Sequence, residues 1–185
     1  MSKYLVPALG VLALAACGQQ AQQQAEAPTA PYETPVAAPA SASMTPTEFV
    51  QAAANADAFK LQSSQLAATR AARADVKELA ATIERESNAA SQALAALAPT
   101  ISVPAPQAMV TEDRTDDLAD LRGKTGAEFD DAYLDDQVEA HNDAIQLYEN
   151  YVRTAEAGPL RTWAESTLAT LRTQRDRVQA LENAT

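Results

Sequence analysis

Few residues in this chain could carry out chemistry. The 185 residues contain one histidine, His141, and one cysteine, Cys17. A hydrolytic triad needs a serine, a histidine and an acid in one geometry, and Ser63, Ser64 and Ser87 have only one histidine among them. The sequence also contains no glycine-rich phosphate loop and no nucleophile-elbow motif. We therefore predict that the protein is not an enzyme.

Acidic residues are concentrated in one stretch of the chain. Residues 112–143 hold twelve acidic and three basic side chains, and the net charge of the whole chain is −11. This sign excludes nucleic acid as a partner, because binding phosphates requires a basic surface. Asp130-Asp131 and Asp135-Asp136 suggest acid–base chemistry, but on a helix we expect most of them to face water. One interpretation is ordinary surface pairing, which contributes little per pair. The functional alternative is a surface that meets a protein partner with a basic surface, or holds divalent cations weakly.

The N-terminus has the pattern of an export signal. Its apolar run, Leu5 to Ala16, is too short to span a hydrocarbon core of ~30 Å. The segment Leu14-Ala15-Ala16-Cys17 resembles the lipobox of bacterial lipoproteins. The resemblance implies cleavage between Ala16 and Cys17 and attachment of acyl chains such as palmitate to Cys17; a plain secretory signal is the alternative. Gly18 then resembles an outer-membrane sorting signal, so we expect a lipid anchor in the outer membrane, with the protein facing the periplasm.

The next segment predicts a tether. Residues 17–44 are rich in alanine, glutamine and proline and show no apolar period, so we expect them to be disordered. The predicted organisation is a signal peptide at 1–16, a lipidated tether at 17–44 and a folded domain at 45–183.

Four long helices are predicted after the tether. Thr45 to Glu48 has the capping-box pattern and begins a helix that runs to Arg70. A second helix covers 75–98, and a long connection, 99–126, holds a short acidic helix at 111–121. A second capping box, Thr125 to Glu128, begins the third helix, and Pro159 begins the fourth. Alanine-rich composition with few aromatic residues favours the same all-α fold, a four-helix bundle with its long connection between helices 2 and 3.

Helix spacing places four polar residues at one height. Lys60, Ser87, His141 and Gln174 each lie near the middle of a predicted helix, on or beside its apolar stripe. The midpoints of antiparallel helices meet, so these residues are expected to form a polar layer in the core.

Three segments resemble a family of exported bacterial proteins. They are Phe59-Lys-Leu-Gln-Ser-Ser-Gln-Leu-Ala67, Phe129 through His141, and Leu160-Arg-Thr-Trp-Ala164 through Leu168. Over about residues 45–180 the chain resembles the domain of unknown function 4142 family, often described as predicted outer membrane proteins. The resemblance implies a ferritin-like four-helix fold and export, but no settled activity.

That family tends to place glutamate in its first helix, Asp-His in the second, and histidine in the third and fourth. By position these fall on Lys60, Glu86-Ser87, His141 and Gln174. The resemblance therefore implies that an ion pair between Lys60 and Glu86 takes the place of a ligand set.

The sequence does not favour a metal site in this layer. A ferritin-like di-iron centre needs several inward carboxylates and two Glu-x-x-His motifs, and Glu-x-x-His occurs nowhere in the chain. We expect no metal and no cofactor, with His141 hydrogen-bonded to Gln174 or Tyr148. The other interpretation is a small-ligand or proton-sensing histidine.

These expectations lead to a non-enzymatic lipoprotein of the cell envelope, a membrane-tethered helical module for interaction or structure. The alternative is a ferritin-like metal-binding or redox protein related to stress.

Overall fold

The computed structural model describes residues 43–184, and these residues are helical without any strand. The signal peptide, Cys17 and most of the predicted tether lie outside the described residues. The elements are α1 (Pro46–Arg70), α2 (Ala74–Leu97), the 3₁₀ turn η1 (Ala98–Ile101), α3 (Glu112–Gly123), α4 (Ala127–Thr154) and α5 (Pro159–Glu182). Among them, no helix is both long and apolar enough to cross a membrane.

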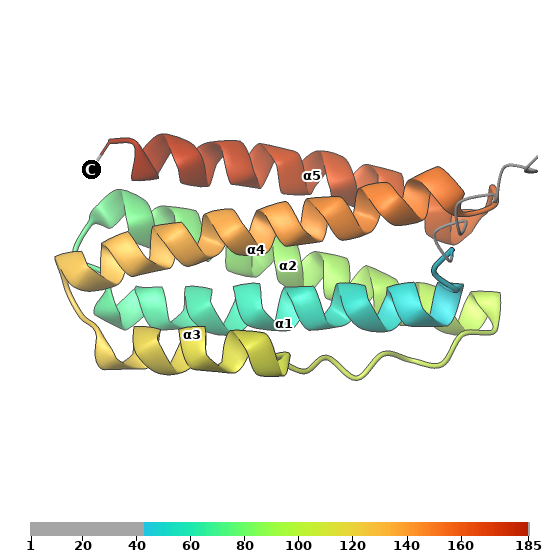
Figure 1. Ribbon diagram of the computed structural model, residues 1–185, viewed down its shortest axis with the longest axis horizontal. Helices are drawn as coiled ribbons and strands as arrows, with labels where there is room; N and C mark the ends of the chain where they lie inside the picture. The colour runs from blue at the N-terminus through green and yellow to red at the C-terminus, as the bar shows by residue number, and fades with distance from the viewer. Residues whose placement is uncertain (1–42, 185) are drawn as a thin grey trace, which may run out of the picture. The chain divides into compact units, whose positions relative to one another are not determined.

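The four long helices pack in neighbouring pairs (Figure 1). α1 contacts α2 and α4, and α5 contacts α4 and α2. The apolar core consists of two main clusters. One contains Phe49, Tyr148 and Leu160, from the start of α1, the end of α4 and the start of α5. The other contains Ile83, Phe129 and other residues from the opposite ends of the helices, so the middle of the domain lies between the two clusters.

The helix starts agree with the sequence at α1 but not at α4. Thr45 caps α1: its hydroxyl accepts a hydrogen bond from Glu48 N at 3.3 Å, and Glu48 Oε2 accepts one from Thr45 N at 2.8 Å. The second capping box, predicted at Thr125, is wrong, because α4 begins one residue later with Gly126 as its cap and no side-chain capping bond. Gly126 N donates to Arg70 O at 2.8 Å, and Gly126 has φ +70°, which glycine adopts without strain.

The connection between α2 and α3 runs along α1. Gln51 Nε2 donates to Gln107 O at 2.6 Å, and Met109 N donates to Asn55 Oδ1 at 3.2 Å. α3 then lies beside α1 (Figure 1), and it buries Leu118 and Leu121. The predicted short acidic helix is therefore present, and it covers one side of the domain.

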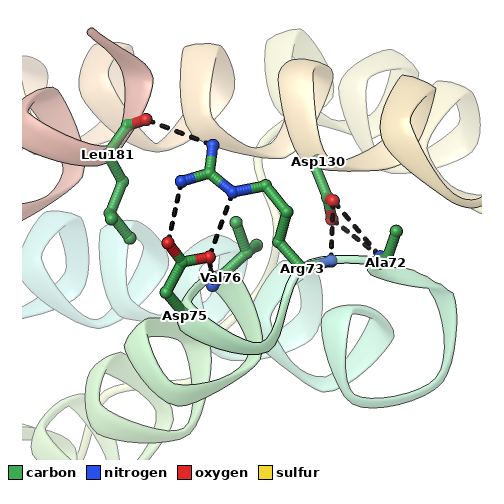
Figure 2. A network of polar contacts seen from close by, with 6 residues as sticks. All are labelled: Ala72, Arg73, Asp75, Val76, Asp130 and Leu181. Carbon is green, nitrogen blue, oxygen red and sulfur yellow. Dashed lines mark hydrogen bonds and ion pairs between the residues drawn. The ribbon is translucent and has the colours of Figure 1, made fainter. Parts of the chain in front are cut away.

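Asp130 joins the turn between α1 and α2 to α4 (Figure 2). Its carboxylate is 1% exposed and accepts hydrogen bonds from Ala72 N at 3.0 and 3.2 Å and from Arg73 N at 2.9 Å. The Arg73 side chain continues the network, because it donates to both oxygens of Asp75 and to Leu181 O at the end of α5. The expectation that this acidic residue faces water is thus wrong for Asp130, although Asp131 is exposed.

Replacing Asp130 tests this junction. Asp130→Ala removes the acceptor of two backbone N–H groups, so we expect the free energy of unfolding to fall by about 2 kcal/mol. Asp131→Ala, which removes a neighbouring exposed carboxylate, should stay within about 0.5 kcal/mol of wild type. Chemical denaturation measures both, and equal effects of the two changes would contradict the assigned role.

Candidate functional site

A layer of buried polar side chains separates the two apolar clusters. The predicted members Lys60, Ser87, His141 and Gln174 are all at most 3% exposed, and they come from four different helices. Glu86 is half-buried, at 32% side-chain exposure. Asp57, Ser63, Ser64 and Gln137 are also buried in the middle of α1 and α4. The layer contains every polar residue expected from the helix midpoints, together with several that were not expected.

The buried cation in the layer has a different partner from the one expected. Lys60 Nζ lies 2.9 Å from Asp57 Oδ1, and both side chains are 3% exposed. The predicted ion pair of Lys60 with Glu86 is therefore wrong. Asp57 is one turn earlier on the same helix, where the i, i+3 spacing brings the two side chains together. That spacing is the sequence signal that could have identified the pair.

His141 is completely buried, and both of its ring nitrogens have partners. Nδ1 lies 2.7 Å from Gln137 O, one turn earlier on α4, and Nε2 lies 3.1 Å from Gln174 Oε1. Gln174, rather than Tyr148, is thus the side-chain partner. Burial, followed by the Lys60 cation, lowers the pKa of His141 to about 4. Lysine and burial outweigh the two hydrogen bonds, which act in the opposite direction.

Gln174 extends the contact from His141 to the surface. Its Nε2 donates to Glu86 Oε2 at 2.8 Å, so hydrogen bonds link α4 to α5 and α5 to α2. Glu86 also lies 4.0 Å from Arg85, which is largely exposed. A continuous chain therefore leads from a buried imidazole to a carboxylate in partial contact with water.

A second set of hydrogen bonds joins α1 and α4. Gln137 Nε2 donates to Ser63 Oγ at 2.7 Å, and Ser64 Oγ lies 2.9 Å from the Tyr133 hydroxyl. The helix midpoints alone did not indicate Gln137 and Tyr133, although both belong to the segment from Phe129 to His141. Among the described residues, two buried atoms have no partner, Ser87 Oγ and Gln137 Oε1.

A small cavity opens onto the layer beside Ser87. Its volume is about 10 Å³, and it is bordered by Asp57, Lys60, Glu86, Ser87 and Gln174 among others. This volume is close to the minimum that accommodates one water molecule. At most one water molecule fits beside Ser87 Oγ, and the cavity is too small for an organic substrate.

A larger groove, at one end of the domain, lies away from these polar groups. It has a volume of about 430 Å³ and lies where α1 begins and α4 ends, with Met44, Ile101 and Leu160 in its mainly apolar lining. It holds one carboxylate, Glu156, and one guanidinium group, Arg161. No pair of groups suited to acid–base or metal chemistry converges there.

The donor set of the polar layer does not fit a transition metal. Within residues 43–184, no three side chains of histidine, cysteine, aspartate or glutamate come together as metal ligands. The Asp57 carboxylate is already paired with Lys60, and an ammonium group at this position repels a divalent cation. Nε2 of His141 already has a hydrogen-bond partner in Gln174 Oε1, so it is not available to a metal ion.

Exposed carboxylates are concentrated on α3 and on α4 as far as Asp143, and we call this surface the acidic face. We define it by its nine exposed carboxylates, which are Glu112, Asp113, Asp116, Asp120, Glu128, Asp131, Asp135, Glu139 and Asp143. Arg114 connects the two helices beneath this face. Its guanidinium lies 3.1 Å from Asp117 and 3.2 Å from Glu139, also contacts Asp143, and lies over the Phe59 ring.

The carboxylates of this face repel one another. Burial, and then the charges of Asp117 and Asp135, raise the pKa of Asp136 to about 7. The shift therefore results first from the burial of Asp136 and second from the negative charges beside it.

Comparison with known proteins gives one family and two similar folds. The family described as domain of unknown function (DUF4142) matches residues 31–181. A solved structure titled "CopM in the Cu(II)-bound form" is 13% identical, with a TM-score of 0.64, and covers 75% of this chain and 95% of its own. A DUF305 fragment from Deinococcus radiodurans is 16% identical, with a TM-score of 0.67, and covers 77% of this chain and 99% of its own. No curated protein sequence matches this chain. At these identities the solved structures show a shared helical fold alone.

The Lys60–Asp57 pair generates a stability prediction. Lys60→Ala leaves the Asp57 carboxylate buried with only the Ser91 hydroxyl, which donates to it at 3.1 Å. We expect the free energy of unfolding to fall by about 3–5 kcal/mol, the usual effect of breaking a buried pair from one side. The double change Lys60→Met with Asp57→Leu should recover much of this loss. Chemical denaturation measures both, and a Lys60→Ala effect below about 0.5 kcal/mol would contradict the buried pair.

Burial of His141 predicts that acid destabilises the protein. The pKa of His141 is about 4 in the folded state, against 6.5 for a free histidine. Between these values the unfolded chain binds more protons, so stability falls as the pH is lowered from about 6.5 to about 4. From pH 7 to pH 5 this histidine should account for a loss of about 2 kcal/mol. Denaturation curves at the two pH values measure the loss, and His141→Gln should lack this part of it; the same loss in the variant would assign it to other groups.

Proposed function

Because the chain belongs to the domain of unknown function 4142 family, we propose that it is a non-enzymatic, membrane-tethered module of the cell envelope. Its helices support the ferritin-like four-helix bundle that the sequence predicts. In this proposal the module acts by presenting the acidic face to a protein partner with a basic surface.

The proposed location depends on the N-terminal sequence. The lipobox-like segment ending at Cys17 supports a lipid anchor, and Gly18 favours the outer membrane, with the protein facing the periplasm. Three acyl chains on Cys17 would give stable anchoring, since more than one chain is needed. The segment between Cys17 and the first described residue, Ser43, would keep the helical domain close to the membrane without requiring the domain itself to bind lipid.

The acidic face is the observation that carries the proposed mode of action. Its nine exposed carboxylates lie on two helices that Arg114 holds together. Such a surface attracts basic partners and speeds their association at low salt.

The alternative function is a ferritin-like metal-binding or redox protein of the envelope. One observation favours it, since the similar CopM structure is described as Cu(II)-bound. The donor set of the polar layer argues against it, because Lys60 and Gln174 occupy the groups that would have to bind the metal. Iron, manganese, zinc or copper purified in stoichiometric amount with the protein, and lost with His141→Ala, would favour the alternative.

Crosslinking in intact cells tests the proposed function. A photo-crosslinking residue replaces Ala119, which is exposed on α3 between the carboxylates, or Ala169, which is exposed on α5. We expect a basic protein to be captured from position 119 and not from position 169. Labelled palmitate should be incorporated by wild type and not by Cys17→Ser, which tests the anchor in the same cells.

Charge reversal supplies the matched control. Asp116→Lys with Asp135→Lys changes the charge of the acidic face and should abolish capture, whereas Glu78→Lys with Glu156→Lys makes the same change at exposed positions elsewhere. Added salt should weaken capture, since exposed charges are screened. Capture that survives reversal of the acidic face would contradict its role, and palmitate on Cys17→Ser would contradict the lipobox.

A further inference from the structure

The two contacts of the buried imidazole require more hydrogen atoms than a neutral histidine has. His141 Nδ1 faces Gln137 O at 2.7 Å, and a carbonyl oxygen only accepts, so Nδ1 must carry a hydrogen. Nε2 faces Gln174 Oε1 at 3.1 Å, and this oxygen also only accepts. The contacts in the structure are therefore those of an imidazolium with hydrogen on both nitrogens.

The Gln174 amide offers a second arrangement of the same atoms. If the amide turns by half a rotation, its NH₂ group donates to a bare Nε2, and its oxygen faces Glu86, 2.8 Å from Gln174 in the structure. Two oxygens at this separation require a hydrogen between them, so the Glu86 carboxyl must then be protonated. Relative to the first arrangement, the Nε2–H bond is broken and an O–H bond is formed, while the imidazolium and carboxylate charges both disappear.

Both complete arrangements thus hold one exchangeable proton, which lies either on His141 Nε2 or on the Glu86 carboxyl group. We propose that His141, Gln174 and Glu86 form a proton-binding site, in which the hydrogen-bond chain from α4 through α5 to α2 is complete only while one proton is bound. When the proton is released, His141 keeps its Nδ1–H, the Gln174 amide turns its NH₂ towards Nε2, and the Glu86 carboxylate separates from Gln174.

The surrounding charges favour the released state at neutral pH. On α1, Lys60 opposes a charge on the imidazole, and Asp57 lies next to Lys60. On α5, the Arg175 cation also lowers the pKa of His141. On α2, Glu86 has Arg85 as a neighbour at 4.0 Å, outside the core. Burial, Lys60 and Arg175 lower the pKa of His141, so the site fills in acid.

The environment of Glu86 suits this exchange. Of the three residues of the proposed site, Glu86 alone is in partial contact with water, and it borders the small cavity next to Ser87. A carboxylate released from Gln174 can turn towards water or Arg85 without leaving a buried charge. Proton binding therefore strengthens the contact between α2 and α5, and proton release weakens it.

The single histidine makes a direct test feasible. The full chain, labelled with ¹⁵N at histidine, gives ring signals from His141 alone, and these distinguish the protonated ring from its two neutral tautomers. We expect the neutral ring at pH 7 to carry its hydrogen on Nδ1. A neutral ring with its hydrogen on Nε2 would overturn the proposal, because Nδ1 would then face Gln137 O without a hydrogen.

A double-mutant cycle tests the coupling to Glu86. Glu86→Gln should lower the protonation midpoint of His141 by about half a pH unit or more, because the linked carboxylate is removed. Glu84→Gln, the same change two residues earlier on α2, should shift it much less. With Gln174→Met in place, the effect of Glu86→Gln should shrink to that of the control. An equal shift with and without Gln174 would mean that Glu86 acts through space alone, which overturns the proposal.

Folding of the variants does not limit the test. Gln174→Met replaces an unbranched side chain with another, and circular dichroism shows whether the helices remain. If this variant does not fold, the tautomer of wild-type His141 and the comparison of Glu86→Gln with Glu84→Gln still decide. Equal midpoints for those two variants would overturn the proposal.

Discussion

Burying the Lys60 ammonium in the middle of four helices requires a negative partner at contact distance, and this constraint shapes the polar layer. Asp57 supplies the charge from the same helix, and Ser91 on α2 donates to its other oxygen. Lys60 has its carboxylate partner on its own helix, and its charge still acts on His141. Burial of the imidazole, followed by the Lys60 charge, keeps His141 neutral near pH 7. The ion pair follows from the buried cation, and the neutral histidine follows first from its own burial and then from the same cation.

Two further charged residues join the outer parts of the domain to this centre. Asp130 holds the turn between α1 and α2 against α4 by accepting backbone hydrogen bonds. Arg114 holds α3 against α4 and the Phe59 ring. In both cases one buried or half-buried charge contacts a segment that has few apolar side chains of its own. The acidic face therefore has a fixed support, although most of its own side chains are exposed.

The helical fold and the height of the polar layer could be predicted from the sequence, because apolar spacing locates helices and the midpoints of antiparallel neighbours meet. The partners within the layer could be predicted only in part. Lys60 has candidate carboxylates on two helices. The i, i+3 spacing favours Asp57, but it does not exclude Glu86, and side-chain geometry decides between them. The observed start of α4 is one residue later than the predicted start for a similar reason. Gly126 N donates a hydrogen bond to Arg70 O at the end of α1, which is distant in sequence. Asp130 shows that a residue in an acidic stretch can be buried when backbone N–H groups converge on it.

The position of the polar layer also determines the alignment of the helices along their axes. A shift of one helical turn, about 5.4 Å, would move Lys60 or His141 into one of the apolar clusters, where neither finds its present partner. Apolar side chains, and alanine above all, tolerate such sliding far better, because they pack in many positions. In a chain with 43 alanines among 185 residues, the layer supplies the register that small side chains alone leave undefined.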